Sequence, residues 1–399
     1  MIELIKKHKK FLLFAFLVSF FSGFGQTFLL SLFNQSLEKD LHIDNLTLSK
    51  TYALATLLAS VFIPLVGKAV DNYSIKTVTV IISMLLGLSF ILFAHVSGPI
   101  ELFFCYFSLR LLGQSSLPLV GTTQIAKYFG RFRGKVQSIT SMGRPLVEAV
   151  LPSIVIFLLF EYGFQVTSYI LGLSFLLFLI PSSLILLNGF SPKQFYEENE
   201  NAIYLNKKEE SLKSIYKGWK IYFFSFSNIG LGFVMTGIFF HNPAILAFKS
   251  WSLSLWASCF AVMSLFSLLS NFLSGYLIDR YGAMKIARLK YLPMFLAFIP
   301  LIYLDSSLSC AVFFAFVGIS VGIASNTHAA VIAEIFGGKN LGTIKSVDIA
   351  FMVVSTSLAP VVFSYGLKFL GVQGFLLTLM SFILFLTVCL NYSYHLYKK

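Results

Sequence analysis

Runs of about 20 predominantly apolar residues follow one another along most of this chain. A run of that length can cross the hydrocarbon core of a bilayer as an α-helix. Because backbone groups inside lipid must bond within their own segment, the runs predict helices. Unbroken runs such as 171–187 and 376–390 lack the alternation of an outer-membrane β-barrel. We expect an all-α membrane protein with twelve spans, near residues 11–33, 48–70, 76–96, 100–125, 136–160, 166–188, 218–240, 249–274, 285–304, 309–334, 344–369 and 372–395.

Composition agrees with a lipid environment. Charged residues make up 12% of the 399 residues, where a soluble domain has about a quarter. The four cysteines all lie within apolar runs without paired spacing, which predicts neither a disulfide framework nor a metal centre. The formal charge of +13 leaves nucleic acid as a partner to consider until the positions of the charges are examined.

The basic residues predict the orientation of the chain. If the N-terminus is cytoplasmic, 24 of the 30 lysines and arginines fall in cytoplasmic segments and four fall outside. The remaining two, Arg110 and Arg144, lie inside spans. This asymmetry predicts a multi-pass protein of the cell inner membrane with both termini in the cytoplasm. The excess charge is then a topology signal, and we expect no nucleic-acid partner.

A single long polar segment, residues 189–217, divides the spans into six and six. We expect it to be a solvated cytoplasmic linker, although an amphipathic helix on the membrane surface is an alternative. The predicted domains are therefore an N-terminal bundle at 1–188 and a C-terminal bundle at 218–399.

The two halves repeat at an offset near 208 residues. Gly67 and Asp71 correspond to Gly275 and Asp279, and the Gly-Phe-Gly at 23–25 corresponds to the Gly-Leu-Gly at 230–232. Tyr-Phe-Gly at 128–130 likewise corresponds to Ile-Phe-Gly at 335–337. An even number of spans per repeat gives both halves the same orientation, so the pattern predicts two pseudo-symmetric six-helix bundles related by an axis along the membrane normal.

On these residues the chain resembles the major facilitator superfamily over essentially its whole length. The turns at 67–76 and 275–285 carry that superfamily's most specific motif, although Asn72 and Ser74 replace the usual arginine and glycine in the first copy. The resemblance implies that these turns latch the two halves while the carrier switches faces. The latch residues would be Gly67, Asp71, Lys76, Gly275, Asp279 and Arg280.

A finer resemblance concerns spans 4 and 5. Arg-Leu-Leu-Gly at 110–113 resembles the family's fourth-helix arginine motif, and Gly-Arg-Pro at 143–145 stands where drug antiporters carry a different glycine-proline motif. Together with Glu148 and Glu334, these residues resemble bacterial carriers of the monocarboxylate and oxalate–formate group.

Charged residues inside spans are costly and are therefore functional candidates. Arg110, Arg144 and Glu148 lie close to the midplane of spans 4 and 5, and the spacing of Arg144 and Glu148 lets them pair on one helix face. Two readings stay open for that pair: a permanent structural ion pair, or an arginine that holds an anionic substrate with Glu148 as proton carrier. Arg110 is a candidate substrate contact, because an arginine fork suits a carboxylate.

Several polar residues are weaker candidates. Gln26 and Asn228 lie in spans 1 and 7 beside the paired glycines, where either substrate contact or helix packing would explain them. Asp348 and His328 lie near the cytoplasmic ends of spans 11 and 10, and either proton coupling or structural pairing would explain them. Glu334 ends span 10 and is expected to belong to the cytoplasmic latch.

We found no phosphate-binding loop for ATP, no cofactor or metal motif and no catalytic constellation, so we do not expect an enzyme. The hypothesis is a secondary active transporter, a symporter or antiporter that moves a small or medium organic anion, with a carboxylate and proton coupling as first expectations. It would work as a monomer in the lipid bilayer. The alternatives are an exporter of a larger polycarboxylate such as a siderophore, a drug or metabolite efflux carrier, and a channel or membrane-embedded enzyme.

Overall fold

The computed structural model describes residues 2–121, 140–189, 218–336 and 341–398. Every regular element in these ranges is helical. The chain divides into two compact units, Met1–Ile203 and Tyr204–Lys399. Most of the expected linker, and the Tyr-Phe-Gly at 128–130, lie outside the described residues.

The first unit begins with a broken span. Helix α1 (Ile2–Phe21) is followed by η1 (Ser22–Gly25), α2 (Thr27–Leu30), η2 (Ser31–Phe33) and α3 (Asn34–Asp40), with a 46° bend between Gly25 and Thr27. The bend lies directly after the second glycine of the Gly-Phe-Gly at 23–25. The remaining elements of the unit are α4 (Asn45–Asn72), α5 (Ile75–Phe93), α6 (Pro99–Leu109), η3 (Arg110–Ser116), α9 (Gly143–Ser174), η5 (Phe175–Leu179) and α10 (Ile180–Leu186).

The second unit begins with α13 (Trp219–Asn228) and ends with the 58-residue α20 (Leu341–Lys398). Between them lie α14 (Gly230–Phe240), α15 (Asn242–Lys249), α16 (Leu253–Tyr281), α17 (Ala283–Ala287), α18 (Tyr291–Tyr303) and α19 (Ser307–Phe336). Span 8, expected from residue 249, starts at Leu253, because Ser252 caps the helix by accepting a hydrogen bond from the Leu255 amide.

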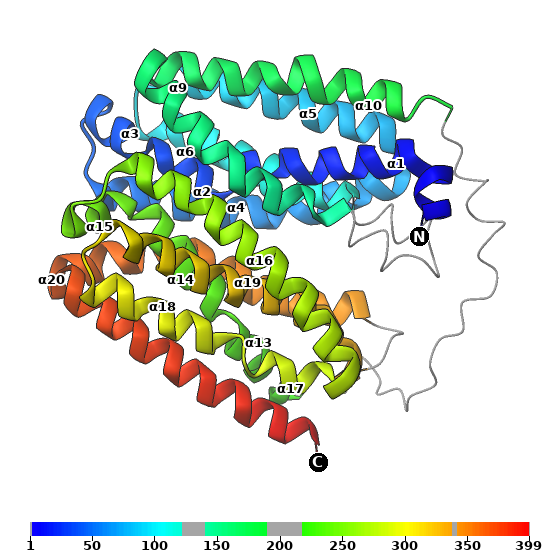
Figure 1. The fold of residues 1–399 in the computed structure, drawn as a ribbon. Helices are drawn as coiled ribbons and strands as arrows, with labels where there is room; N and C mark the ends of the chain where they lie inside the picture. The colour runs from blue at the N-terminus through cyan, green and yellow to red at the C-terminus, as the bar shows by residue number, and fades with distance from the viewer. Residues whose placement is uncertain (1, 122–139, 190–217, 337–340, 399) are drawn as a thin grey trace. The chain divides into compact units, whose positions relative to one another are not determined.

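Two of the longest helices each contain two spans. Gly163 in α9 and Gly371 in α20 have φ values of 73° and 66°, and Figure 1 shows the chain turning back within both helices. Both values lie in a backbone region that essentially only glycine adopts with ψ near 180°. Pro152 and Pro360 lie inside the same two helices, each eleven residues before its glycine. These positions differ by 208, so the repeat found in the sequence recurs in the backbone.

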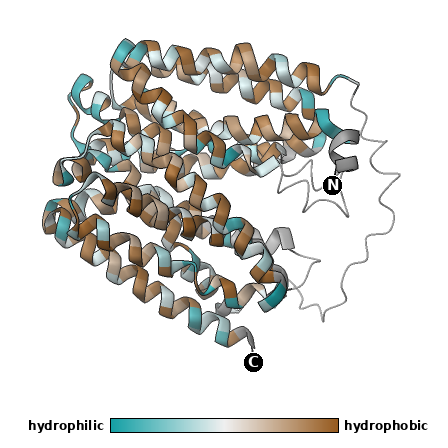
Figure 2. Ribbon diagram, in the orientation of Figure 1, coloured by the Kyte–Doolittle hydropathy of each residue, from teal (hydrophilic) through white to brown (hydrophobic). Residues whose placement is uncertain are grey.

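Within the described residues, length and apolar composition identify eight helices that could cross a membrane, or nine when the bent first span is included. Two of the eight contain the Gly163 and Gly371 turns, and the span expected at 100–125 is described only as far as Gly121. The fold is the expected all-α one. Large apolar side chains such as Phe160, Phe178 and Phe369 are 72%, 67% and 75% exposed, as lipid-facing residues would be. Figure 2 shows apolar residues along the length of these helices.

In the second unit, small residues bring two helices close together. Atoms added as Cβ at Gly318 and Gly322 of α19 would lie 2.2 Å from the Met263 carbonyl oxygen and 2.0 Å from the Ser270 hydroxyl of α16. Interhelical hydrogen bonds run beside this contact, from Asn271 to Ser325 (2.7 Å) and from Asn326 to the Asn271 carbonyl. Close approach and polar contacts of this kind stabilise helix pairs in lipid.

Candidate functional site

Arg110 lies in the interior of the first unit. It is the first residue of η3, a stretch of π-helix that continues α6, and its exposed fraction is 1%. Its Nη1 donates to the Gly25 carbonyl oxygen (3.2 Å) and to the Thr27 hydroxyl (3.3 Å). Both acceptors belong to the broken first span. Arg110 therefore connects the break in span 1 to the π-helical start of η3, and π-helical turns are frequent at functional sites.

Glycines on both sides make this contact possible. A Cβ at Gly25 would lie 2.3 Å from the Leu109 carbonyl oxygen and 2.6 Å from the Gln114 amide nitrogen. A Cβ at Gly113 would lie 2.7 Å from the Gly25 Cα. All of these are backbone atoms, so no side chain can rotate away to make room. The two glycines set the distance between the spans at which Arg110 reaches span 1.

An aromatic ring lies beside the guanidinium, and a second ring packs against the first. The Arg110 guanidinium carbon lies 5.0 Å from the centre of the Tyr52 ring, a cation–π distance. The Tyr52 hydroxyl hydrogen-bonds to the Thr27 hydroxyl (2.7 Å), and the Tyr106 ring packs edge-on against Tyr52 at 5.2 Å. Both tyrosines are fully buried. The arginine is thus held by a carbonyl, a hydroxyl and a ring, and none of these groups carries a negative charge.

Several buried donors at this site have no acceptor in the described part of the chain. They are Nε and Nη2 of Arg110 and Nε2 of Gln26, the residue between Gly25 and Thr27. A buried donor without a partner costs on the order of 1–3 kcal/mol, and more when it is charged. The arrangement therefore favours a group that brings negative charge and several acceptor oxygens.

Arg144 and Glu148 pair on α9, as their spacing predicts. Arg144 Nε lies 2.8 Å from Glu148 Oε1, and the two side chains are 45% and 11% exposed. Gly143 places this part of α9 against α1, because a Cβ there would lie 2.4 Å from the Phe16 carbonyl oxygen. Arg144 also acts on Arg110 electrostatically as a second positive charge. The two guanidiniums and one carboxylate leave this part of the unit with a net positive charge.

In the second unit, Asn228 contacts a residue that was not among the sequence candidates. The Lys290 ammonium donates to the Asn228 side-chain oxygen, and Lys290 is only 5% exposed. The Lys290 carbonyl accepts a hydrogen bond from Ser320 of α19. Tyr291 donates to the Ser227 carbonyl (2.8 Å) and accepts from the Gly230 amide (3.1 Å). Asn228 therefore belongs to a polar junction between α13 and the start of α18.

Asp348 and His328 lie together. His328 Nε2 of α19 is 3.1 Å from Asp348 Oδ2 of α20, and the side chains are 33% and 4% exposed. Asp348 also lies within electrostatic reach of Lys290. The sequence treated Asp348, His328 and Asn228 as separate candidates. In the structure Asp348 contacts His328 and acts electrostatically on Lys290, which donates to Asn228.

The predicted latch residues lie near the ends of the helices. Gly67 and Lys76 belong to α4 and α5, and the side chains of Asp71 and Asp279 are outside the described part. Gly275 packs beside Asn326, and exposed Arg280 lies over the Tyr281 ring at 5.3 Å. Their role as a latch between the halves stays a prediction.

Glu334, expected in the latch, makes a contact within its own unit. Its carboxylate accepts from the backbone amides of Ala283 (2.8 Å) and Met284 (3.3 Å), which begin α17. Negative charge at a helix start satisfies free amides and the helix dipole. Gly282, with φ of 88°, makes the turn into α17. Glu334 therefore ties the end of α19 to the turn that carries the second copy of the motif.

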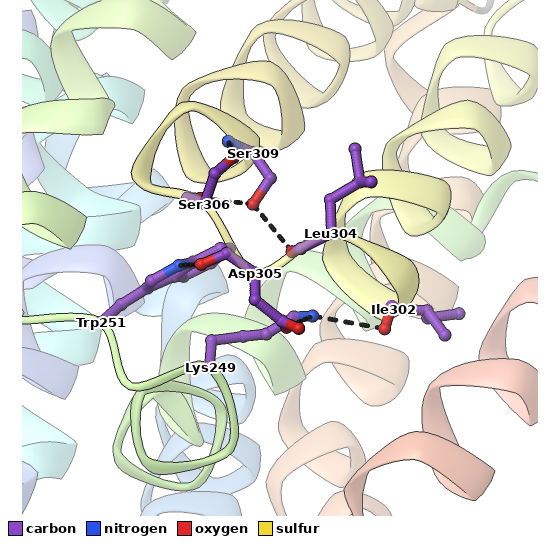
Figure 3. Close-up of polar contacts among 7 residues, drawn as sticks. All are labelled: Lys249, Trp251, Ile302, Leu304, Asp305, Ser306 and Ser309. Carbon is purple, nitrogen blue, oxygen red and sulfur yellow. Dashed lines mark hydrogen bonds and ion pairs between the residues drawn. The ribbon is translucent and has the colours of Figure 1, made fainter.

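A second buried lysine lies at the end of α15. The Lys249 side chain is fully buried and donates to Asp305 Oδ1 (2.7 Å) and to the Ile302 carbonyl (3.2 Å), as Figure 3 shows. The Trp251 indole donates to the Asp305 carbonyl at 3.4 Å. Because Asp305 is 82% exposed, we regard this contact as a structural tie between two loops. It also supplies a matched control for Lys290.

Two features of these sites escaped the sequence reasoning. Lys290 was counted as a basic residue of the turn after span 8, although it lies five residues inside the expected span 285–304. That position is the signal that could have identified it as buried. Thr27 and Tyr52 carry no comparable signal, because polar and aromatic residues are common in spans and their contact with Arg110 is tertiary.

Comparisons with known proteins place the fold. Residues 15–360 match the family described as Major Facilitator Superfamily. The comparison with curated proteins found no match. Among solved structures, the chain is similar to a bacterial homologue of the human lysosomal transporter Spinster in an inward-facing, unoccupied conformation, with 14% identity, a TM-score of 0.68 and coverage of 97% of this chain and 96% of that one. It is also similar to the nucleoside transporter NupG, with 15% identity, a TM-score of 0.71 and coverage of 96% and 99%. At such identities the likeness concerns the fold alone.

Proposed function

The chain belongs to the major facilitator superfamily, and from that premise we propose that this secondary transporter carries a small or medium organic anion, specifically a carboxylate, with proton coupling. The observation that carries the proposal is Arg110. It is a fully buried guanidinium whose Nε and Nη2 have no acceptor among the described residues.

The chemistry of the site supports an anion. A guanidinium presents a planar fork of donors that matches the two oxygens of a carboxylate. The unpartnered Gln26 amide adds a further donor from the adjacent span, and Arg144 adds positive charge. A carrier of cationic drugs would be expected to present buried carboxylates instead. The carboxylate of Glu148 is already paired with Arg144.

We test the proposal by thermal unfolding of the purified full-length protein in a panel of carboxylic acids and, for comparison, organic cations. A ligand that binds only the folded state raises the unfolding temperature as its concentration rises. We expect at least one carboxylate to stabilise the protein and the cations to have no effect. Stabilisation by cations alone would contradict the proposal.

Variants then assign the effect to Arg110. Arg110→Gln should abolish the stabilisation by the carboxylate, and Arg110→Lys should weaken it, because lysine keeps the charge but loses the fork. The control is Lys50→Gln, which removes a positive charge from the exposed surface of α4. Full stabilisation of folded Arg110→Gln by the same acid would show that Arg110 does not hold the substrate.

A further inference from the structure

Lys290 is a buried charge without a role in the proposed anion site. It lies between α17 and α18, inside the segment Ala283–Tyr303 that is long and apolar enough to cross a membrane. A buried ammonium has three donors and no acceptor, and here it meets the Asn228 amide oxygen. An amide satisfies one donor but carries no charge. Asp348 acts on Lys290 electrostatically as a negative charge.

Asp348 acts on more than one neighbour. It faces Lys290 electrostatically and also lies 3.1 Å from His328 Nε2. Asp348 is buried, but a third of the His328 side chain is exposed. An ionised carboxylate can only accept, so His328 Nε2 must carry a hydrogen in this contact. The histidine is therefore the most exposed member of the group.

The other titratable groups nearby are two tyrosines, Cys389 and the charges around them. Asp348 interacts electrostatically with both Tyr291 of α18 and Tyr394 at the end of α20. Arg288 and Glu334, which carry opposite charges, also act on Tyr394, and the Arg288 guanidinium lies 5.8 Å from its ring. Neither tyrosine titrates near neutral pH in its ordinary range. Within the described residues, His328 is then the group of this cluster suited to exchange a proton near pH 7.

We infer that Lys290, Asp348 and His328 form the proton-binding site of this carrier, with Lys290 as a positioning residue whose positive charge offsets the negative charge of Asp348. The inference rests on the proposed proton coupling and locates the proton in the second unit rather than on Glu148.

The charges in the two states follow directly. In the empty state the Lys290 ammonium and the Asp348 carboxylate cancel, and neutral His328 donates Nε2–H to Asp348. The proton adds to the other ring nitrogen of His328, so the imidazolium raises the charge of the cluster from zero to +1. Loading one proton together with one carboxylate anion then leaves the net charge of the carrier unchanged. A cluster of this kind would favour movement of the anion and the proton in the same direction.

The test follows ring protonation of His328 by NMR in the full-length protein, labelled at histidine and held in lipid nanodiscs without any substrate. The chain has six histidines, and His328→Gln identifies the signal. Asp348→Asn should lower the titration midpoint of His328 by about one pH unit or more, because a neighbouring carboxylate favours the imidazolium. Lys290→Gln should raise the midpoint, since it removes a neighbouring positive charge.

Two further variants separate this role from a structural one. Lys290→Arg keeps the charge and should keep the midpoint of the natural protein. Lys249→Gln removes another buried lysine of the described part of this unit, far along the sequence from the cluster, and should not change the midpoint. An unchanged midpoint in Asp348→Asn or in Lys290→Gln would overturn the inference. Because no substrate is used, that result would leave the anion site at Arg110 standing, and failure of the carboxylate screen would leave this titration standing.

Discussion

Burying an arginine costs free energy because its charge loses its hydration. The described groups around Arg110 offset only part of that cost. The Gly25 carbonyl, the Thr27 hydroxyl and the Tyr52 ring are dipolar or polarisable groups without formal charge. Burying an ionised group without a counter-charge is strongly unfavourable. We therefore interpret the local charge as part of function, a site whose balance a bound carboxylate completes.

The position of Arg110 depends on Gly25, which gives the first prediction. Gly25→Ala places a methyl group 2.3 Å from the Leu109 carbonyl oxygen, so span 1 must move away from η3. Overpacking of this kind costs about 1–3 kcal/mol. We expect a clear fall in the unfolding temperature and weaker stabilisation by a carboxylate ligand. Gly67→Ala is the control, because nothing lies within 4 Å of the added atom. Equal unfolding temperatures for the two variants would refute the close contact.

The sequence could predict a candidate site residue where a charge inside a membrane span was informative by itself. Arg110 stands out because a span rarely holds a charge, and the pairing of Arg144 with Glu148 follows from helical spacing. The hydrogen-bond partners of Arg110 were not predictable, because Gly25 and Thr27 lie 85 and 83 residues away in the broken first span. Lys290 was assigned to the wrong environment, since a count of basic residues near span ends does not distinguish a turn from the buried start of a helix.

At the scale of elements, the spans are interrupted where the sequence has glycine and proline. The break at Gly25 and Gln26 separates α1 from α2, and the turns at Gly163 and Gly371 divide α9 and α20. The sequence predicted these spans as separate apolar runs. It did not predict that each pair of spans would form one nearly continuous helix, interrupted only at the glycine. It also gave no sign of the π-helical stretch at Arg110, which depends on packing against span 1.

The matched turns give a prediction about elements. Gly163→Ala and Gly371→Ala should each destabilise the protein by about 1–3 kcal/mol, because alanine is strained at these positive φ values. No atom lies within 4 Å of either added methyl, so the effect would come from the backbone conformation alone. Thermal unfolding compares them with Gly98→Ala, where φ is −164° and space is equally open. If Gly98→Ala had the larger effect, the assigned turn conformation would be wrong.

At the scale of the whole molecule, the chain is a duplicated helical unit in a membrane. Proline and glycine recur at the same offset in α9 and α20, whereas the charged residues do not. Arg144 and Glu148 in the first unit correspond at this offset to Met352 and Thr356 in the second. The backbone plan was thus kept in both units while the polar groups diverged. This divergence is consistent with the proposals above, in which the first unit binds the anion and the second unit binds the proton.

The predicted orientation can be tested with single cysteines. Lys39→Cys and Lys76→Cys are both exposed in the structure, and the distribution of basic residues places them on opposite sides of the membrane. In a variant without the four natural cysteines, a maleimide that cannot cross membranes should label Lys39→Cys from the outside. It should label Lys76→Cys only after the cells are opened. The reverse pattern would invert the topology.

The most direct test of the account is counterflow in proteoliposomes that contain the purified protein and a carboxylate selected by the stability screen. Unlabelled carboxylate inside should drive transient accumulation of labelled carboxylate from outside, which a carrier produces and a channel does not. We expect Arg110→Gln to abolish this accumulation and Lys50→Gln to preserve it. Undiminished counterflow through Arg110→Gln would contradict the account.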